Sequence, residues 1–495
     1  VYSVSLVAVG GSMSLKSLTL FTTYDRDALS VLRIIGPTKC ANLQIVNGIE
    51  NGNFRLDAIA EGDLVILQRH ICQYYSDYQK IISLAHSQNK PIIFDIDDLL
   101  FELPENHPDR LSGYYSEALL PMLQAVIEAD LVTVATHPLR DYLLTYNSNI
   151  AVIPNYLNDS FWTLREIPEL LDHNEIITIG YMGGQTHRPD LDMIMPALLT
   201  INQKYPGRIR YHFWGIDAPD ALRDLSQVDW CPPASYAYED FAEFFQTQVA
   251  DIMIAPLCDN LFNACKSAIK YLEYGALGIP GVYSRIAAYE NTIANGQDGI
   301  LAATTDEWVS ALSLLIENPS LRLYLAKNAQ QKITNSWLLS KNYQRQIKHY
   351  RQIIRAKPTA RRKSPILSIF PVLSAQYYDL INRQKNKLTE TQHSLQETRH
   401  SLKEKQEVEQ SLNAQLQEHK KTIHMLDTQV IELKGEITGY LLSKSWRFTR
   451  PFRKLNQKIQ ISFKKLKDLI SILLHKNWRV TKMLRKLIHK ILGEN

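Results

Sequence analysis

Two lysines and a glutamate fall on one face of a segment that reads as a helix, NACKSAIKYLEYGALGIP, residues 263–280. The pattern predicts a cap at Asn263 and a stop at the closing glycine and proline. Lys266, Lys270 and Glu273 follow an i, i+4, i+7 spacing and therefore share a side of that helix. In the first turn, a lysine opposes the helix macrodipole at a cost of about 0.3 to 1 kcal/mol unless an anion binds there. The segment thus predicts either a phosphate site or an exposed Lys270–Glu273 pair worth about 0.2 to 0.5 kcal/mol.

A pair of glycines offers a second candidate anion site. Gly183 and Gly184 follow an apolar run in IGYMGGQTH and precede a helix expected over residues 189–204. Glycine lets the backbone approach an anion closely, and the start of a helix offers free N–H groups. A tight strand-to-helix turn would need the same residues, and the spacing does not match the GxGxxG fingerprint of nicotinamide binding. His187, at the end of this loop, is a possible cleft residue.

Three carboxylates lie within four positions at the end of another apolar run. Asp95, Asp97 and Asp98 repel one another, so a structural role would require them to cap a helix or to pair with Arg69 or Arg110. The carboxyl end of a strand is also where open α/β sheets place ligand sites. We therefore treat the three aspartates as candidate catalytic residues.

Two further functions fit the aspartates. Asp95 and Asp97 could open a phosphatase of the haloacid dehalogenase type, with Asp95 as nucleophile and a bound magnesium. That motif is expected in an opening strand, however, and Asp98-Leu99 stands where that family has a variable residue and Thr or Val. The pair could also form a metal clamp for a nucleotide sugar, as in single-sheet glycosyltransferases. A two-domain organisation speaks against the clamp.

The elements that position these residues read as two parallel sheets. Continuous apolar runs separated by helix-length segments are typical of strands covered on both faces. In the first half the expected strands are residues 18–21, 43–46, 64–67, 91–96, 131–135 and 150–153, and in the second half 176–181, 209–214, 249–254, 281–283 and 299–301. Arg69 and His70 follow one of these runs and could line the same cleft, although a lone histidine there is more often a packing residue.

The fold class is therefore α/β, with two Rossmann-like domains followed by a coiled coil and a basic amphipathic helical tail. We expect the domains at residues 1–157 and 174–340, with a helix at 341–355 that could pack back across the first domain. A linker at residues 356–384 precedes heptad-spaced apolar residues at 385–442, which predict a coiled coil or, alternatively, a single solvated helix. The tail spans residues 443–495.

Composition narrows the class of protein. With 495 residues, 45% hydrophobic and 21% charged, the chain is ordinary for folded domains and too long for one core. Its five scattered cysteines, without CxxC, favour a reducing compartment and argue against a zinc or disulfide framework. No apolar run reaches the roughly 18 residues that span a bilayer. A signal peptide is not expected, because no basic segment precedes the apolar start.

Three segments together resemble the two-Rossmann-domain glycosyltransferases of the GT-B fold. These are KSAIKYLEYGALGIPGVYS at residues 266–284, the GYMGGQTH loop, and IPNYLND at the domain junction. The likeness is to the family 4 group that builds bacterial envelope polysaccharides; it covers about residues 15–355, and LEYGALGIP is its most specific part. It implies an enzyme that takes a sugar from a nucleoside-diphosphate sugar to an acceptor hydroxyl in the cleft between the domains.

The resemblance also implies roles for residues of the donor domain. In that group, a helix with an ExxxxxxxE pattern holds the donor, and the second Glu, here Glu273, grips the ribose. Basic residues and the glycine loop neutralise the pyrophosphate. The matching residues here are Lys266, Lys270, Gly183 and Gly184. The resemblance implies no metal and no cofactor, because lysines and backbone amides would meet the leaving-group charge.

Two positions depart from the family pattern. The first Glu of the pattern is replaced by Cys265, which removes the usual contact to the donor sugar. Many members have a histidine at the end of the strand that here carries Asp95, Asp97 and Asp98. One of these, and Asp97 before the other two, is therefore expected to contact the sugar or the acceptor or to act as a base. The first departure motivates an alternative function, a non-catalytic membrane-associated scaffold with a degenerate glycosyltransferase fold; the phosphatase ranks third.

The tail is a distinct basic module. Residues 443–495 hold fifteen Lys and Arg against two acidic residues, and LLSKSWRFTRPFRKL resembles a segment appended to many envelope glycosyltransferases. Apolar residues at helical spacing among the basic ones suit a helix on an anionic membrane surface; a partner-binding helix or a nucleic-acid contact is the alternative. The expected partners are a nucleotide-sugar donor, a glycan or lipid-linked acceptor, an anionic membrane and a second copy or partner through the coiled coil, with no nucleic acid. The expected location is cytoplasmic, peripheral to the inner membrane.

Overall fold

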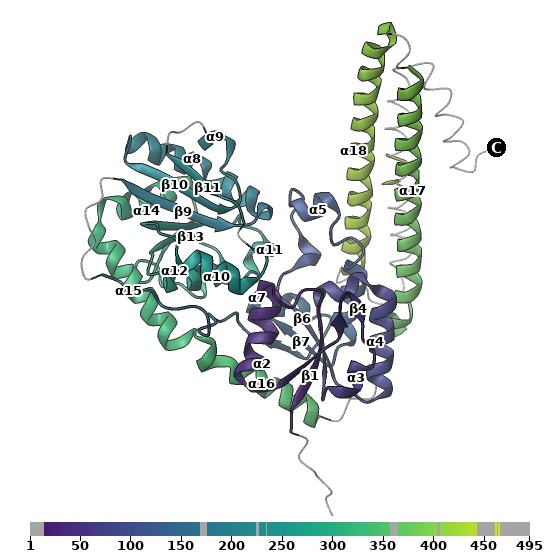
Figure 1. Ribbon diagram of the computed structural model, residues 1–495, viewed down its shortest axis with the longest axis horizontal. Coiled ribbons are helices and arrows are strands. Elements are labelled where there is room, and N and C mark those ends of the chain that lie inside the picture. The colour runs from purple at the N-terminus through teal and green to yellow at the C-terminus, as the bar shows by residue number, and fades with distance from the viewer. Residues whose placement is uncertain are drawn as a thin grey trace, which may run out of the picture. The chain divides into compact units, whose positions relative to one another are not determined.

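The computed structural model describes residues 14–168, 176–223, 227–233, 235–356, 365–402, 406–442, 461–462 and 464–465. The chain divides into two compact units, Val1–Pro371 and Val372–Asn495. The first unit holds two six-stranded parallel sheets, each covered by helices (Figure 1).

The first sheet has the strand order β2-β1-β5-β6-β7-β8. Its strands are β1 (Ser17–Phe21), β2 (Gln44–Asn47), β5 (Val65–Gln68), β6 (Ile92–Ile96), β7 (Leu131–Val134) and β8 (Ile150–Val152). The register pairs Gln68 with Asp95 and Asp95 with Thr133, so these three polar residues lie side by side at the carboxyl edge of the sheet. Every strand predicted for this half is confirmed: the four central strands are short apolar runs buried on both faces, whereas the edge strands β2 and β8 are only partly buried.

Helices surround this sheet. They are α1 (Ala28–Ser30), the π-helix η1 (Val31–Ile35), α2 (Gly36–Cys40), α3 (Ala58–Glu61), the 3-10 helix η2 (Arg69–Gln73), α4 (Tyr75–Ser87), the 3-10 helix η3 (Leu100–Glu102), α5 (Pro108–Ser112), α6 (Leu119–Glu128) and α7 (His137–Leu143). A short hairpin of β3 (Ile49–Glu50) and β4 (Asn53–Phe54) was not expected. Its strands have two residues each, too few to show an apolar period.

The second sheet has the strand order β11-β10-β9-β12-β13-β14. Its strands are β9 (Ile177–Gly183), β10 (Ile209–Gly215), β11 (Val228–Cys231), β12 (Ile252–Ala255), β13 (Gly281–Ser284) and β14 (Ile300–Ala302). The sequence missed β11, an edge strand whose residues are exposed or half-buried and which therefore lacks a continuous apolar run. The strand order reverses between β9 and β12, and a ligand crevice is expected at that point.

Two buried clusters pack on opposite faces of the second sheet. The surrounding helices are the 3-10 helix η4 (Gln185–His187), α8 (Arg188–Lys204), α9 (Asp220–Arg223), α10 (Tyr238–Gln246), α11 (Leu261–Ala264), α12 (Ile269–Ala276), α13 (Ala287–Glu290), α14 (Thr305–Glu317) and α15 (Pro319–Ser336).

The single helix predicted over residues 263–280 is wrong. Two short helices, α11 and α12, are separated by a break at residues 265–268, and the cap of α11 is Asn260, whose side chain accepts from the Asn263 N–H at 2.9 Å. Asn263 is buried, and its amide donates to Asp190 Oδ1 at 3.0 Å and to the Cys258 carbonyl at 3.0 Å. Lys266 therefore lies in the break and not in a first helical turn.

Helix α16 (Leu339–Arg355) leaves the second sheet and packs against the first, where it contacts α2 (Figure 1). Its Gln346 donates to the Arg33 carbonyl at 2.6 Å. Ile347 and Tyr350 are buried in the same cluster as Leu18 and Ile66 of the first sheet. The chain thus returns to the first domain, as its sequence suggested.

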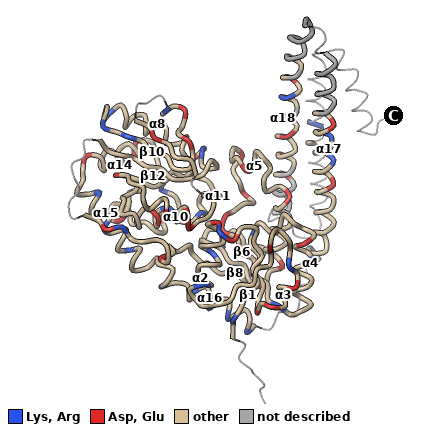
Figure 2. The backbone as a smooth tube through the Cα atoms, viewed as in Figure 1, with Lys and Arg blue, Asp and Glu red and all other residues tan. Residues whose placement is uncertain are grey.

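The second unit is helical over most of its described residues. A 3-10 turn η5 (Pro365–Ser368) precedes α17 (Phe370–Leu402), and α18 is Gln406–Leu442. Helix therefore replaces the later part of the linker expected at residues 356–384, where Phe370, Tyr377 and Ile381 recur at helical spacing and are buried. Both long helices carry acidic and basic residues (Figure 2). The coiled coil remains a prediction, because several of its heptad side chains lie outside the described residues.

Among the residues that the structure describes, no helix is both long enough and apolar enough to cross a membrane. The predicted basic tail lies almost wholly outside the described residues.

Candidate active site

A cavity of about 170 Å³ lies between the carboxyl ends of the two sheets. The first domain lines it with residues that follow β1 and β6 and with Asn155 of the interdomain connection; the second domain contributes His187, the break before α12, and the start of α12. The lining residues are Ala28, Leu29, Leu32, Arg33, Asp97, Asp98, Asn155, His187, Leu257, Lys266, Ser267, Ile269, Lys270 and Tyr289. Five of the residues predicted from the sequence therefore line one cavity although they lie far apart in the chain: Asp97, Asp98, His187, Lys266 and Lys270.

Arg69 links two of the aspartates. Its Nη1 lies 2.6 Å from Asp97 Oδ1 and 3.4 Å from Asp98 Oδ2, and its guanidinium faces the Tyr115 ring at 5.9 Å. Lys266 Nζ approaches Asp98 Oδ2 from the second domain at 3.6 Å. Arg69 follows β5 and the aspartates follow β6, so neighbouring parallel strands bring these charges together.

The two aspartates differ in acidity. Burial raises the pKa of Asp97 to about 6, against the lowering effect of Arg69. Burial also acts on Asp98, but Lys266 and Arg69 outweigh it, and the pKa of Asp98 is lowered. Asp97 therefore has the proton affinity of a group that can gain and lose a proton near neutral pH, whereas Asp98 stays ionised.

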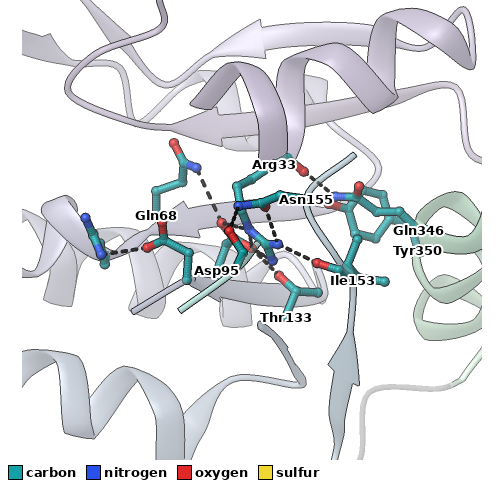
Figure 3. Close-up of polar contacts among 11 residues, drawn as sticks. Arg33, Gln68, Asp95, Thr133, Ile153, Asn155, Gln346 and Tyr350 are labelled. Carbon is teal, nitrogen blue, oxygen red and sulfur yellow. Dashed lines mark hydrogen bonds and ion pairs between the residues drawn. The ribbon is translucent and has the colours of Figure 1, made fainter. Parts of the chain in front are cut away.

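Asp95 is the centre of a buried polar network and has no exposed surface (Figure 3). Arg33 Nη2 lies 2.7 Å from Asp95 Oδ1, and the Thr133 hydroxyl donates to the same oxygen at 2.6 Å. Gln68 donates to Asp95 Oδ2 at 3.4 Å. Because its oxygens are occupied and shielded, this geometry favours a positioning role for Asp95 over the nucleophilic or catalytic role considered from sequence.

Arg33 extends that network toward the cavity. Its Nη1 donates to the Ile153 carbonyl at 2.5 Å and to Asn155 Oδ1 at 3.2 Å, as Figure 3 shows. The Asn155 amide in turn donates to Ser267 Oγ at 2.9 Å. The sequence gave no signal for Arg33, an isolated arginine in an apolar segment, or for Ser267; Asn155 lay in the quoted IPNYLND segment without an assigned role.

Glu273 is buried, with 3% of its surface exposed, and its Oε1 accepts from the Tyr238 hydroxyl at 2.7 Å. Burial raises the pKa of Glu273 to about 7, although Tyr238 and Lys270 lower it. The alternative prediction for this segment, an exposed Lys270–Glu273 pair, is therefore wrong. Tyr238 of α10 was missed, because nothing in a local sequence window links it to residue 273.

Lys270 is partly buried and faces the ring of Tyr181 at 6.0 Å. Burial lowers its pKa, despite the opposing effect of Glu273. Among the described residues, no carboxylate lies within 4.0 Å of the Lys270 ammonium, whereas Lys266 has Asp98 at 3.6 Å. The two lysines therefore enter the cavity with different partners.

His187 forms a dyad with Asp190, with Nδ1 2.8 Å from Asp190 Oδ2. Burial and the neighbouring Lys270 lower the pKa of His187 to about 4, so the ring is neutral near pH 7. Asp190 Oδ1 also accepts from the Cys258 N–H at 2.8 Å and from Asn263. The dyad thus fixes the His187 ring at the cavity wall.

The remaining candidates, Gly183, Gly184 and His70, are not among the residues that line the cavity. Gly183 ends β9 and Gly184 follows it, directly before η4. A Cβ on Gly183 would meet the Tyr181 hydroxyl at 2.5 Å, whereas a Cβ on Gly184 would meet no atom within 4 Å. His70 is not part of the cavity wall; burial and Arg69 lower its pKa to about 4.

A search of the described residues finds no group of three or more His, Cys, Asp or Glu arranged to hold a metal ion. The five cysteines are free thiols, and Cys265 is fully buried.

Two Rossmann-like domains with a cavity between the carboxyl ends of their sheets are the arrangement of the GT-B fold class. Residues 174–318, which hold most of the second domain, match the family model described as glycosyl transferases group 1. The resemblance to GT-B glycosyltransferases is thereby confirmed.

The solved structures that match this chain are distant from it in sequence. Anabaena Alr3699/HepE, in a complex with UDP-glucose, is 12% identical, with a TM-score of 0.47 over 68% of this chain and 100% of that chain. Sucrose-phosphate synthase from Thermosynechococcus elongatus is 12% identical, with a TM-score of 0.48 over 69% of this chain and 100% of that one. TarM is 15% identical, with a TM-score of 0.42 over 59% and 55%. No curated protein matches the sequence.

Proposed function

We propose that this chain transfers a sugar from a nucleoside-diphosphate sugar to a hydroxyl of a glycan or lipid-linked acceptor in the synthesis of bacterial envelope polysaccharide. The observation that carries the proposal is Lys270, a partly buried ammonium at the cavity wall without a carboxylate within 4.0 Å among the described residues. A buried cation without a counter-ion is costly, and a pyrophosphate would supply one.

The donor would lie against the second domain. Lys270 and the backbone N–H groups around Gly184 would meet the pyrophosphate charge, with Lys266 shared between it and Asp98. Glu273 would accept hydrogen bonds from the ribose with the oxygen that Tyr238 leaves free. Because these groups can neutralise the leaving group themselves, we propose a reaction that needs no metal ion.

The acceptor hydroxyl must lose a proton as the new glycosidic bond forms. Asp97 lines the cavity, and its pKa, raised to about 6 by burial, suits a group that accepts this proton near neutral pH. Cys265 has no exposed surface, so its thiol does not replace the glutamate that contacts the donor sugar in the family pattern.

Isothermal titration of the full chain with UDP-, GDP- and TDP-sugars tests the donor site. We expect binding that persists in a metal chelator and is lost in Lys270→Ala and in Glu273→Ala. Lys80→Ala is the matched control, since Lys80 is an exposed lysine paired with Asp77 on α4. Binding that requires a divalent cation would contradict the metal-independent mechanism.

The same titration separates the alternatives. If none of the nucleotides binds, the chain is better explained as a non-catalytic scaffold with a degenerate fold. Magnesium-dependent phosphate release that Asp95→Asn abolishes would favour the phosphatase. The buried Arg33–Asp95 ion pair speaks against that outcome, because a nucleophile must be reachable by substrate.

We further propose a cytoplasmic location at the inner membrane. The basic composition of residues 443–495 supports contact with an anionic surface, and the heptad pattern of residues 385–442 supports association of two copies or of a partner. Such a location would bring the cavity to a lipid-linked acceptor.

A further inference from the structure

The break between α11 and α12 is held by the first domain at three consecutive residues. The Thr136 hydroxyl donates to the Cys265 carbonyl at 2.7 Å, Lys266 Nζ lies 3.6 Å from Asp98 Oδ2, and the Asn155 amide donates to Ser267 Oγ at 2.9 Å. The three partners come from three places in the first domain: the start of α7, the end of β6, and the interdomain connection.

Two of these partners are themselves fixed inside the first domain. Asn155 is 8% exposed, and its Oδ1 accepts from Arg33 Nη1 at 3.2 Å. Arg33 is in turn held by Asp95 at 2.7 Å and by the Ile153 carbonyl (Figure 3). Thr136 caps α7 and accepts from the Leu139 N–H at 3.4 Å. Asn155 therefore ties the break to a buried polar network, and Thr136 ties it to the start of α7.

The break leads directly into α12, whose first turn carries Lys270 and whose next turn carries Glu273. A shift of residues 265–267 would therefore move both lysines of the donor site. We propose that Asn155 and Thr136 are positioning residues, which hold this break from across the domain boundary and thereby set the place of Lys266 and Lys270. The effect on donor binding rests on the function proposed above. The contact of Asn155 and Thr136 with the break does not depend on that function.

The link is tested by hydrogen exchange of the full chain, followed in peptides that contain residues 265–277. We expect Asn155→Leu and Ser267→Ala each to speed exchange about threefold to tenfold, as the loss of one hydrogen bond predicts. The double variant should exchange no faster than Asn155→Leu alone, because Asn155→Leu already removes the hydrogen bond to Ser267 and also the one from Arg33. Thr136→Val should speed exchange independently of that pair.

Conservative variants separate positioning from general loss of stability. Ser267→Thr and Thr136→Ser keep the hydroxyls and should restore slow exchange. Ser87→Ala is the control, since the Ser87 hydroxyl bonds within α4, to the Leu84 carbonyl at 2.8 Å, and should leave these peptides unchanged. If Asn155→Leu fails to fold, Ser267→Ala still decides, because Ser267 lies outside the buried network.

Titration with UDP provides the second readout. We expect Ser267→Ala to weaken UDP binding about threefold to tenfold, and Ser267→Thr to bind as the unchanged chain does. Unchanged exchange in Ser267→Ala, or additive effects in the double variant, would overturn the proposal. If the unchanged chain binds no nucleotide, the proposed function fails, while the exchange measurements still decide whether the first domain positions the break.

Discussion

At the scale of single residues, the two glycines of the β9 loop have different surroundings. Gly183 packs against Tyr181, so a side chain there would disturb the fold, whereas the space at Gly184 is open. We expect Gly184→Ala to leave the unfolding temperature unchanged within a degree or two and to weaken nucleoside-diphosphate binding about tenfold, because a methyl group would stand where the phosphate approaches the backbone. Thermal unfolding and calorimetry measure the two effects.

Gly183→Ala is the useful contrast to this variant, since it should lower the unfolding temperature through the clash with Tyr181. Unchanged nucleotide affinity in a well-folded Gly184→Ala variant would remove this loop from the donor site.

Asp97 gives the site a pH dependence of its own. Burial raises its pKa to about 6, with Asp98 adding to the effect and Arg69 opposing it. A base must be ionised before it can accept a proton. We therefore expect kcat/KM of the transfer reaction, measured as release of nucleoside diphosphate, to rise with pH and to level off above about pH 6. Asp97→Asn should lower kcat by about 10²- to 10⁴-fold and remove this limb of the profile.

Asp77→Asn, which changes a half-buried carboxylate on α4, away from the cavity, should retain both the rate and its pH profile. A limb near pH 6 that survives in Asp97→Asn would assign the proton transfer to another group.

At the scale of elements, Glu273 joins α12 to α10 through Tyr238. Its pKa is raised by burial to about 7 from an ordinary value near 4.5, so between these values the folded chain holds a proton that the unfolded chain has released. The free energy of unfolding must therefore fall as pH rises through this window, by an amount on the order of 3 kcal/mol for this group. Glu273→Gln removes that contribution.

We accordingly expect the unfolding temperature of Glu273→Gln, relative to the unchanged chain, to increase from pH 5 to pH 8. Glu239→Gln on the exposed side of α10 should show no such trend. A difference that stays constant with pH would mean that Glu273 is ionised throughout.

At the scale of the whole molecule, the chain divides its charge unequally. Residues 443–495 carry fifteen basic and two acidic residues, and each basic residue near an anionic surface contributes about 1 kcal/mol of attraction. We expect the full chain to float with anionic liposomes at low salt and to be released at high salt, and a chain of residues 1–442 to stay behind. Neutral liposomes are the control, and equal flotation of the two chains would contradict the membrane proposal.

The sequence by itself determined the layered fold, because a parallel strand buried on both faces must be a continuous apolar run, and such runs can be read locally. It therefore located the strands of both sheets but missed β11, which lies exposed at an edge, and the two-residue strands β3 and β4. It also singled out the short segment that carries Lys270 and Glu273.

Only the tertiary structure decided what each charged residue does, since burial and partners come from distant segments. Adjacent aspartates look alike in sequence, yet Asp95 is enclosed by Arg33 and Thr133 while Asp97 faces the cavity. Of the two lysines and the glutamate that the sequence singled out, Lys270 and Glu273 do lie on one helix. Lys266 does not, because the predicted helix is broken before α12. Lys266 lies in that break and Lys270 directly after it, and the break is contacted by residues of the first domain, which no spacing within residues 263–280 could encode.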